Sequence, residues 1–194
     1  MIDRTIYDIF RRGSKTYFYS TLFFPPAVRE DVFSLYSFVR TADDYVDAVP
    51  QQVEEFYTLI DRYAVAMAGE ATGDVVIDSF VELSGRKGID PGWTAAFLRS
   101  MERDITVGSY RTIRDLEGYL YGSSEVIGLM MACILDLPPE SHTAARNLGR
   151  AMQYVNFIRD IAEDLTLGRT YFPRDEMNRF GLDDLSAASV ARDP

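Results

Sequence analysis

Polar side chains recur every three or four residues in two segments that lie far apart in the chain. The first polar stripe is Tyr36, Arg40, Asp43 and Asp47, and the second polar stripe is Gln153, Asn156, Asp160 and Asp164. Steps of three and four residues keep side chains on one face of an α-helix. The pattern therefore predicts two helices, each with a polar face that carries a pair of aspartates.

Apolar residues run beside each polar stripe rather than opposite it. They are Val32, Leu35, Val39 and Val46 in the first helix, and Val155, Ile158, Ile161 and Leu165 in the second. This arrangement places carboxylates next to a buried face, where a charge is costly unless it is paired or bound to a cation. Two such stripes predict a cavity that holds metal and an anionic ligand.

Prolines and capping residues predict where several helices begin. An aspartate followed by proline is typical of a helix start, and a threonine three residues before an acid has capping-box spacing. The signals are Pro25 with Pro26 before the first stripe, Pro50 at the opening of the next helix, Asp90 with Pro91, and Thr112 with Asp115.

The helix that starts near Thr112 is expected to run to Leu137, where two prolines stop it. The helix of the second stripe is expected to end at Gly168, since glycine commonly follows a helix end. Apart from ambiguous short runs such as residues 75–77, no segment shows the alternation of a half-buried strand. The predicted fold class is all-α, with about seven or eight helices.

Length and composition fit one domain over residues 1–194. The chain is 47% hydrophobic, enough for one sizeable core, and it contains no repeat, low-complexity tract or linker. Its longest apolar runs, such as residues 127–135, are too short to span a bilayer, and the N-terminus lacks the apolar segment of a secretory signal. A cytoplasmic location is therefore expected.

The formal net charge of −10 argues against nucleic acid as a partner, because phosphates would be repelled by most of the surface. A bound polyphosphate would need local positive charge. Four basic residues stand near the two stripes and could supply it together with metal ions: Lys15, Arg40, Arg159 and Arg169.

The single cysteine and the single histidine are not expected to carry chemistry. Cys133 has no partner for an internal disulfide, cannot form a thiolate metal cluster, and lies in an apolar run that predicts a core position. His142 follows Pro138, Pro139 and Glu140 at the expected start of a helix, where a solvated side chain is the favoured interpretation.

The two aspartate pairs suit a hard cation. Residues four apart on a helix are neighbours on its surface, so each pair can offer oxygens to one site. Magnesium prefers oxygen ligands and is usually held by one or two carboxylates plus substrate phosphates. Arg40 and Arg159 could contact the same phosphate oxygens. A diphosphate held in this way becomes a good leaving group, because its developing charge is already neutralised.

An acidic cluster on a helix can also be an ordinary solvated face. For Asp43, Asp44 and Asp47 taken alone, this interpretation is as good as a metal site. The second stripe favours the metal site, because a chance repetition of the same arrangement is improbable.

Three motifs give the chain a family resemblance. Residues 14–19, SKTYFY, with residues 35–47, LYSFVRTADDYVD, resemble the N-terminal signature of squalene and phytoene synthases. Residues 153–164, QYVNFIRDIAED, with residues 168–173, GRTYFP, are similar to the second aspartate-rich motif of that family. Residues 119–128, YLYGSSEVIG, resemble the central helix of its phytoene-synthase branch. The motifs occur in the family's order and cover nearly the whole chain.

The resemblance implies a head-to-head prenyl transferase in the helical isoprenoid-synthase fold. Such an enzyme condenses two allylic prenyl diphosphates through a cyclopropylcarbinyl diphosphate. Formation of phytoene from geranylgeranyl diphosphate is favoured over formation of squalene or dehydrosqualene from farnesyl diphosphate. NADPH is not expected if phytoene is the product.

The resemblance also assigns roles to residues. Asp43, Asp47, Asp160 and Asp164 would hold Mg²⁺, with Mn²⁺ as an alternative, and would form the catalytic set with Arg40 and Tyr36. Substrate contacts would come from Ser14, Lys15, Thr16, Tyr36, Arg40, Tyr119, Gln153, Asn156, Arg159 and Tyr171.

The chain departs from the family pattern at two points. Ser124 and Glu125 stand in the central helix where many members carry small apolar residues, and Glu125 is interpreted as branch variation. Family members also continue for several helices beyond the second motif. The last helices are therefore expected to be missing, which would expose a cavity wall and favour self-association. Peripheral membrane contact is a further expectation, since the product would be a water-insoluble hydrocarbon.

Two alternatives come from other classes. Some relatives keep this fold without catalysis and act as binding or assembly factors, although such relatives tend to lose the aspartates that stand here. A class I terpene cyclase shares the fold and the metal, but its second motif typically mixes Asn, Ser or Thr and Glu as ligands, unlike Asp160 and Asp164.

Overall fold

The structure, a computed structural model, describes residues 2–191, and it confirms the expected all-α class. Seven or eight helices were too few: the described residues form twelve α-helices, a π-helical turn and a 3-10 turn. The elements are α1 (Arg4–Gly13), α2 (Lys15–Thr21), α3 (Pro26–Asp47), α4 (Val53–Met67), α5 (Val75–Lys87), α6 (Pro91–Thr106), α7 (Ile113–Leu120), the π-helical turn η1 (Tyr121–Glu125), α8 (Val126–Ile134), the 3-10 turn η2 (Pro139–Ser141), α9 (His142–Arg159), α10 (Ile161–Thr166), α11 (Arg174–Arg179) and α12 (Ala187–Val190).

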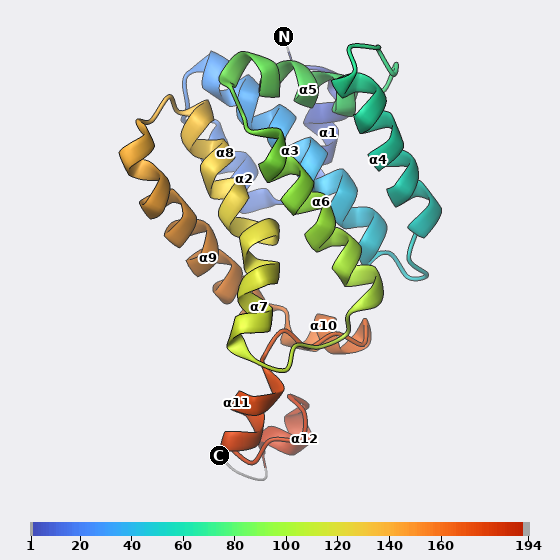
Figure 1. Cartoon of the computed structure of the whole chain (residues 1–194), viewed down its shortest axis with the longest axis vertical. Helices are drawn as coiled ribbons and strands as arrows, with labels where there is room; N and C mark the ends of the chain where they lie inside the picture. The colour runs from blue at the N-terminus through green and yellow to red at the C-terminus, as the bar shows by residue number, and fades with distance from the viewer. Residues whose placement is uncertain (1, 192–194) are drawn as a thin grey trace.

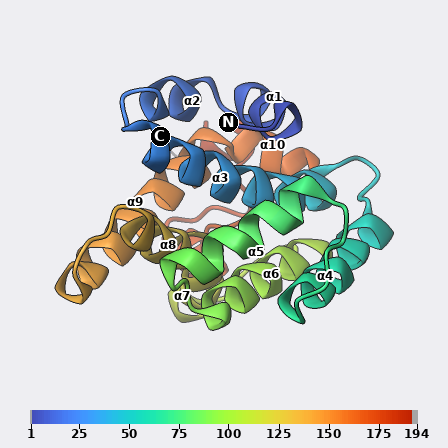
Figure 2. The same ribbon diagram turned by 90° about the horizontal axis from the view of Figure 1, so that it is seen from above.

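The first-stripe helix, α3, is the centre of the bundle. Helices α1, α4, α5 and α6 pack around it (Figure 1 and Figure 2). Helices α11 and α12 lie at the end of the molecule that is opposite the N-terminus. Its apolar flank is buried as predicted at Val32, Leu35 and Val46. Phe38 is fully buried and stacks on Phe80 of α5 at 4.0 Å between ring centroids. This packing holds the helix rigidly, so the polar stripe beside it is held as well.

Several predicted helix boundaries are confirmed. Pro26 is the first residue of α3, and the Asp90 carboxylate accepts a hydrogen bond from the backbone N–H of Gly92 at the start of α6. Thr112 and Asp115 form the predicted capping box of α7. The expectation for Pro50 was wrong by a few residues, since α4 begins at Val53. The ambiguous run of residues 75–77 is the first turn of α5.

Aromatic packing fixes the two N-terminal helices against α3. The ring of Phe10 in α1 stacks on Tyr36 at 3.9 Å, and Phe18 in α2 packs edge-on against Phe10. Ser14 ends α1 and caps α2, because its side chain accepts a hydrogen bond from the N–H of Tyr17. The α1–α2 junction is thereby placed beside the first polar stripe.

The predicted helix from Thr112 to Leu137 is interrupted. It runs as α7, then as the π turn η1, then as α8, which ends before the two prolines as expected. A π turn contains one more residue than an α turn and changes which way the following side chains face. Around it, α6 packs on one side and α9 on the other. Hydrophobic periodicity does not reveal a single inserted residue, so the sequence did not predict it.

Glycines allow α8 and α9 to approach closely. A Cβ atom on Gly128 would lie 2.2 Å from the carbonyl oxygen of Ala145, well inside contact distance. The backbone of α9 cannot retreat without losing its packing on η1 and α8.

Gly128→Ala should therefore lower the free energy of unfolding by about 1–3 kcal/mol, the usual cost of forcing atoms into a packed interface. Gly85→Ala is the matched control, because Gly85 is exposed in α5 with nothing within 4 Å of the added atom. It should raise stability by about 0.5–1 kcal/mol through helix propensity. Urea denaturation of both variants measures this, and equal shifts would contradict the close approach.

Glu125 is a buried ion-pair residue rather than neutral branch variation. Its side chain is 1% exposed, and its two oxygens accept hydrogen bonds from the Nε atoms of Arg146 and Arg150 at 2.8 and 2.7 Å. The pairing fastens η1 to α9, since both arginines belong to α9. A buried glutamate without these partners would be strongly unfavourable.

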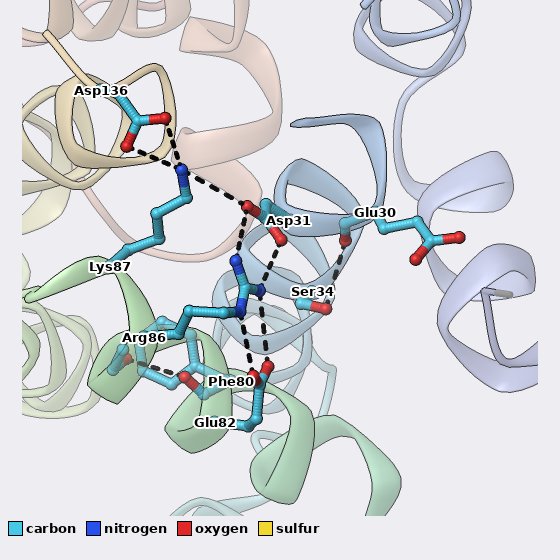
Figure 3. Close-up of polar contacts among 9 residues, drawn as sticks. Glu30, Asp31, Ser34, Phe80, Glu82, Arg86, Lys87 and Asp136 are labelled. Carbon is cyan, nitrogen blue, oxygen red and sulfur yellow. Dashed lines mark hydrogen bonds and ion pairs between the residues drawn. The ribbon is translucent and has the colours of Figure 1, made fainter. Parts of the chain in front are cut away.

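A second buried carboxylate ties α3 to α5 (Figure 3). Arg86 donates two hydrogen bonds to Asp31, at 2.7 and 3.2 Å, and Lys87 binds Asp136 at 2.8 Å. Asp31 lies twelve residues before Asp43, which is about 18 Å along the helix at 1.5 Å per residue. The cluster therefore stabilises the end of α3 that lies away from the aspartates of the polar stripe.

The helix of the second stripe also differs from the prediction. It breaks at Asp160, which has φ −101° and ψ 10°, so α9 carries Gln153 and Asn156 while α10 carries Asp164. Gly168 follows α10 with φ 71°, which agrees with the predicted helix end. The expected burial of the apolar flank was wrong for Val155 and Ile158, which are 62% and 64% exposed, because no described element covers this face of α9.

The single cysteine and the single histidine are both partly buried, so the histidine is less solvated than expected. Cys133 packs partly buried against the core, where burial raises the pKa of its thiol. His142 is the first residue of α9 and contacts the ring of Trp93 edge-on. None of the helices within residues 2–191 combines the length and the apolar character needed to cross a bilayer.

Candidate active site

Both polar stripes face one cavity of about 630 Å³, which lies between α3, α6, η1, α9 and α10. Lys15 and Thr16 are exposed and do not line it; their neighbours Gly13 and Tyr17 do. All other residues that the sequence assigned to the site line the cavity: Ser14, Tyr36, Arg40, Asp43, Asp47, Tyr119, Gln153, Asn156, Arg159, Asp160, Asp164 and Tyr171.

Arg40 is the cation of the first stripe. Its guanidinium donates to Asp43 at 3.0 Å and pairs with Asp44, while its buried Nε atom has no hydrogen-bond partner within the described residues. A buried donor left without a partner is costly and indicates that a ligand oxygen would satisfy it. Tyr36, one turn earlier, stays a neutral phenol because burial raises its pKa to about 12.

Negative charge is crowded on the first stripe. Burial and the nearby Asp47 together raise the pKa of Asp43 to about 7, against the opposing effect of Arg40. Asp43 nevertheless keeps 35% of its side chain exposed, toward the cavity that it lines. The carboxylate is therefore accessible to a cation that would relieve the repulsion.

The second stripe also combines an arginine with crowded carboxylates. Arg159 binds the adjacent Asp160 with two hydrogen bonds, of 2.7 and 2.6 Å. Burial and Asp160 raise the pKa of Asp164 to about 7. Gln153 accepts a long hydrogen bond of 3.4 Å from Asn156. In the first stripe, Asp43 both pairs with Arg40 and has the raised pKa. In the second stripe these features fall on two residues, because Asp160 pairs with Arg159 and Asp164 has the raised pKa.

Arg169 joins the two walls. It follows α10, is 5% exposed, and donates hydrogen bonds to the carboxylate of Asp47 and the carbonyl oxygen of Val46 at the end of α3. Next to it, the backbone of Thr170 donates to the carbonyl oxygen of Gly108 at 2.8 Å. The sequence indicated only that Arg169 lies near a stripe. In the structure it is an interior link that holds α3 against the segment after α10.

Asp104 of α6 is a cavity residue that the sequence analysis missed. It is 6% exposed, and its two oxygens accept hydrogen bonds from the hydroxyls of Tyr119 and Tyr171, both at 2.8 Å. Burial raises its pKa to about 6. The signal was present, because Phe97, Met101 and Asp104 follow one another at steps of four and three residues on the buried face of α6. A carboxylate at an apolar position of a helix indicates a function or an ion pair.

The donor set fits a hard cation. Two carboxyl groups, those of Asp43 and Asp164, have raised pKa values because burial and a neighbouring aspartate disfavour their ionised forms. Within residues 2–191, no three acidic, histidine or cysteine side chains lie close enough together to bind an ion unaided. Magnesium held by carboxylate pairs and completed by phosphate oxygens and water matches this arrangement.

An all-α bundle around one cavity, with two facing aspartate stripes and an arginine on each, defines the helical isoprenoid-synthase class. The sequence model of the squalene/phytoene synthase family matches residues 10–193, and the chain belongs to this family.

Curated relatives and solved structures agree with this assignment. The chain is 28% identical to the 15-cis-phytoene synthase of Synechococcus elongatus, covering 91% of this chain and 62% of the relative. It is 27% identical to the 4,4'-diapophytoene synthase of Staphylococcus haemolyticus, with 91% and 64% covered. The chain thus spans somewhat less than two thirds of the length of these relatives.

Two crystal structures share the fold. A dehydrosqualene synthase in complex with ligand superimposes with a TM-score of 0.83 at 26% identity, covering 91% of this chain and 62% of the other. A squalene synthase from Alicyclobacillus acidocaldarius has a TM-score of 0.76 at 26% identity, with 92% and 70% covered.

Proposed function

We propose that this chain provides the metal-binding and diphosphate-binding part of an enzyme that joins two allylic prenyl diphosphates head to head. The observation that carries the proposal is the pair of aspartate stripes on opposite walls of one cavity, each with its own arginine. Family membership supports the reaction class, since the relatives are phytoene, diapophytoene and squalene synthases.

The residues would bind the substrate through its diphosphate. Arg40 and Arg159 would donate hydrogen bonds to phosphate oxygens, and the free Nε of Arg40 would gain a partner. Asp43, Asp47, Asp160 and Asp164 would hold Mg²⁺, or Mn²⁺ in its place, and the bound ions would neutralise charge on the leaving diphosphate. The side chains would thereby favour ionisation of the carbon–oxygen bond.

The prenyl chain would extend toward the apolar side of the cavity. Val39, Phe97 and Met101 line this side, and Tyr119, Phe157 and Tyr171 form an aromatic cluster next to it. Exclusion of water by these side chains would protect a cationic intermediate from forming an alcohol. Ser14 and Tyr36 would contact the diphosphate end, as would Gln153 and Asn156 near the metals.

The substrate pair that we favour is two molecules of geranylgeranyl diphosphate, with phytoene as the product and no NADPH. The resemblance of residues 119–128 to the phytoene-synthase branch supports this choice, as do the phytoene synthases among the relatives. Farnesyl diphosphate is the second candidate, because a diapophytoene synthase and a dehydrosqualene synthase are similar to the chain to much the same degree.

Mass spectrometry of products separates these candidates. The chain is incubated with geranylgeranyl or farnesyl diphosphate, with Mg²⁺, with Mn²⁺, and with chelator. A dimeric hydrocarbon that forms only with metal supports the transferase, and the preferred substrate identifies the branch. A chain that binds diphosphate with Mg²⁺ but yields no product indicates a binding or assembly role, or a need for polypeptide beyond these residues. A cyclised monomer would instead indicate a terpene cyclase.

Arg40→Ala should weaken the binding of inorganic diphosphate in the presence of Mg²⁺ by about 1.5–3 kcal/mol, the value of one charged hydrogen bond. Calorimetric titration measures this change. Arg62→Ala is the matched control, because Arg62 is 54% exposed on α4 and pairs with Asp74 outside the cavity. Equal affinities for the two variants would remove Arg40 from the diphosphate site.

Self-association and peripheral membrane contact stay predictions. Both are supported by the uncovered face of α9, where Leu148, Val155 and Ile158 are each more than 60% exposed. Contiguous apolar surface of this kind commonly marks an interaction site.

A further inference from the structure

Asp104 uses both of its carboxylate oxygens to hold two phenols. Oδ2 accepts from the hydroxyl of Tyr119 and Oδ1 from that of Tyr171, each at 2.8 Å, and the two hydroxyl oxygens lie 3.4 Å apart. All three residues line the cavity and are less than 8% exposed. They come from α6, from α7 and from the segment after α10, so three distant parts of the chain meet here.

The direction of these hydrogen bonds follows from the groups involved. An ionised carboxylate can only accept, and a tyrosine hydroxyl has one hydrogen to give. The pKa of Asp104, about 6, leaves it ionised at neutral and alkaline pH. Both O–H bonds must then point at Asp104. Each phenol oxygen has only lone pairs left to offer to anything else in the cavity.

The ring faces of these tyrosines are less accessible to a ligand than their hydroxyl oxygens. Phe157 stacks on Tyr171 with 4.4 Å between centroids and 6° between planes, and Tyr110 lies nearly parallel to Tyr171 at 6.1 Å. Tyr119 packs against Tyr110 and Tyr171 at 5.5 and 5.2 Å. A cation–π contact needs an uncovered ring face. Tyr171 in particular is left with its oxygen edge as the group that can face a ligand.

We propose that Asp104 is a positioning residue that makes Tyr119 and Tyr171 hydrogen-bond acceptors toward the cavity, where their oxygens stabilise positive charge on the prenyl carbon. The inference rests on the proposed function. It divides the cavity by polarity: the arginines of the stripes donate to the departing diphosphate, and the phenol oxygens face the carbon that becomes electron-deficient. Fixed dipoles of this kind stabilise charge without reorganisation during the reaction.

The test compares a cationic probe with a neutral one of the same shape. The probes are a geranylgeranyl trimethylammonium ion and its tert-butyl analogue, each titrated into the chain with Mg²⁺ and inorganic diphosphate. The ratio of the two affinities reports charge stabilisation and does not require turnover. The wild-type chain should prefer the cation, and equal affinities would overturn the proposal.

Asp104→Asn keeps the shape and replaces one accepting oxygen with an NH₂ donor. The hydroxyl beside that group must then accept and turn its hydrogen elsewhere. We expect the preference for the cation to fall about tenfold or more, since a hydrogen bond to a charged group is affected. Affinity for inorganic diphosphate should be unchanged. In an active enzyme, kcat should fall while KM stays constant. An unchanged preference overturns the proposal.

Tyr119→Phe and Tyr171→Phe separate the phenol oxygens from the charge of Asp104 itself. These variants keep the carboxylate and remove one oxygen each, so at least one of them should also lower the preference for the cation. If only Asp104→Asn lowers it, the carboxylate acts directly and the positioning role is wrong. The two phenylalanine variants also carry the test if Asp104→Asn does not fold.

Asp31→Asn is the control for lost stability alone. Asp31 is equally buried, and its partners Arg86 and Lys87 lie outside the cavity (Figure 3). This variant should destabilise the fold and leave the preference for the cation at its wild-type value. A wild-type chain that fails to bind inorganic diphosphate with Mg²⁺ would contradict the proposed function. A wild-type chain that binds it, with an unchanged preference in Asp104→Asn, would contradict only the role of Asp104.

Discussion

Asp43→Asn should abolish magnesium-dependent product formation while the helices stay intact. The amide keeps the size of the side chain and removes the charge that would bind the cation. Loss of a metal that stabilises the leaving diphosphate removes several kcal/mol from catalysis, so turnover should fall by about 10³-fold or more. Asp160→Asn should behave in the same way, because Asp160 faces the same cavity from the opposite wall.

The thermal stability of Asp43→Asn should not fall, in contrast to its activity. Burial and Asp47 raise the pKa of Asp43 in the folded chain, so the ionised form opposes folding above that pKa. The stability gained by protonating Asp43 is present at low pH and is lost as the pH rises through about 7. At pH 8 without metal, Asp43→Asn should therefore melt at the same temperature as the wild type or higher.

Product analysis and thermal melts followed by circular dichroism measure both effects. Asp61→Asn is the matched control, since Asp61 is exposed on α4 outside the cavity and should keep full activity. Wild-type turnover in Asp43→Asn or Asp160→Asn would remove that residue from the metal site.

Arg169→Ala should cost the largest amount of stability of the variants that spare the stripes. It removes a nearly buried guanidinium and leaves the carbonyl oxygen of Val46 without this donor. Breaking a buried ion pair typically costs about 3–5 kcal/mol. We expect about 3 kcal/mol here, at the low end of the range, because Asp47 is 38% exposed and can be hydrated.

Urea denaturation measures the change, and Arg179→Ala provides its control. Arg179 is 71% exposed and pairs with Glu176 within α11, so its loss should cost about 0.5 kcal/mol or less. If the two variants are equally stable, Arg169 is not the link between α3 and the segment after α10.

Local signals in the sequence predicted the fold class and many of the residues that line the cavity. Helix starts at Pro26, Asp90 and Thr112 depend on neighbouring residues alone, which is why they could be located. The two stripes depend on helical periodicity, which is also local. Their convergence on one cavity was predicted because carboxylates beside a buried face need a cation as a partner. The sequence offered no information about how α3 and α9 pack.

Features that depend on distant contacts were missed. The partners of Glu125 are Arg146 and Arg150, more than twenty residues away, so the sequence offered no reason to treat it as anything but variation. The hydrogen-bond partners of Asp104 were missed for the same reason, since its tyrosines lie on other elements, although its place on the apolar face of α6 was a local signal. The break at Asp160 also escaped prediction, because the residues around it continue a helical pattern without proline or glycine.

The π turn sets the rotational phase between two interfaces. Tyr119 before the turn and Ser123 within it face the cavity, and on its C-terminal side Gly128 meets Ala145 of α9. One residue fewer would rotate everything after it by about 100°, the angle per residue of an α-helix. Gly128 could then no longer face α9 while the preceding side chains face the cavity. A deletion or insertion between positions 119 and 128 should therefore disrupt these interfaces at least as much as a substitution there.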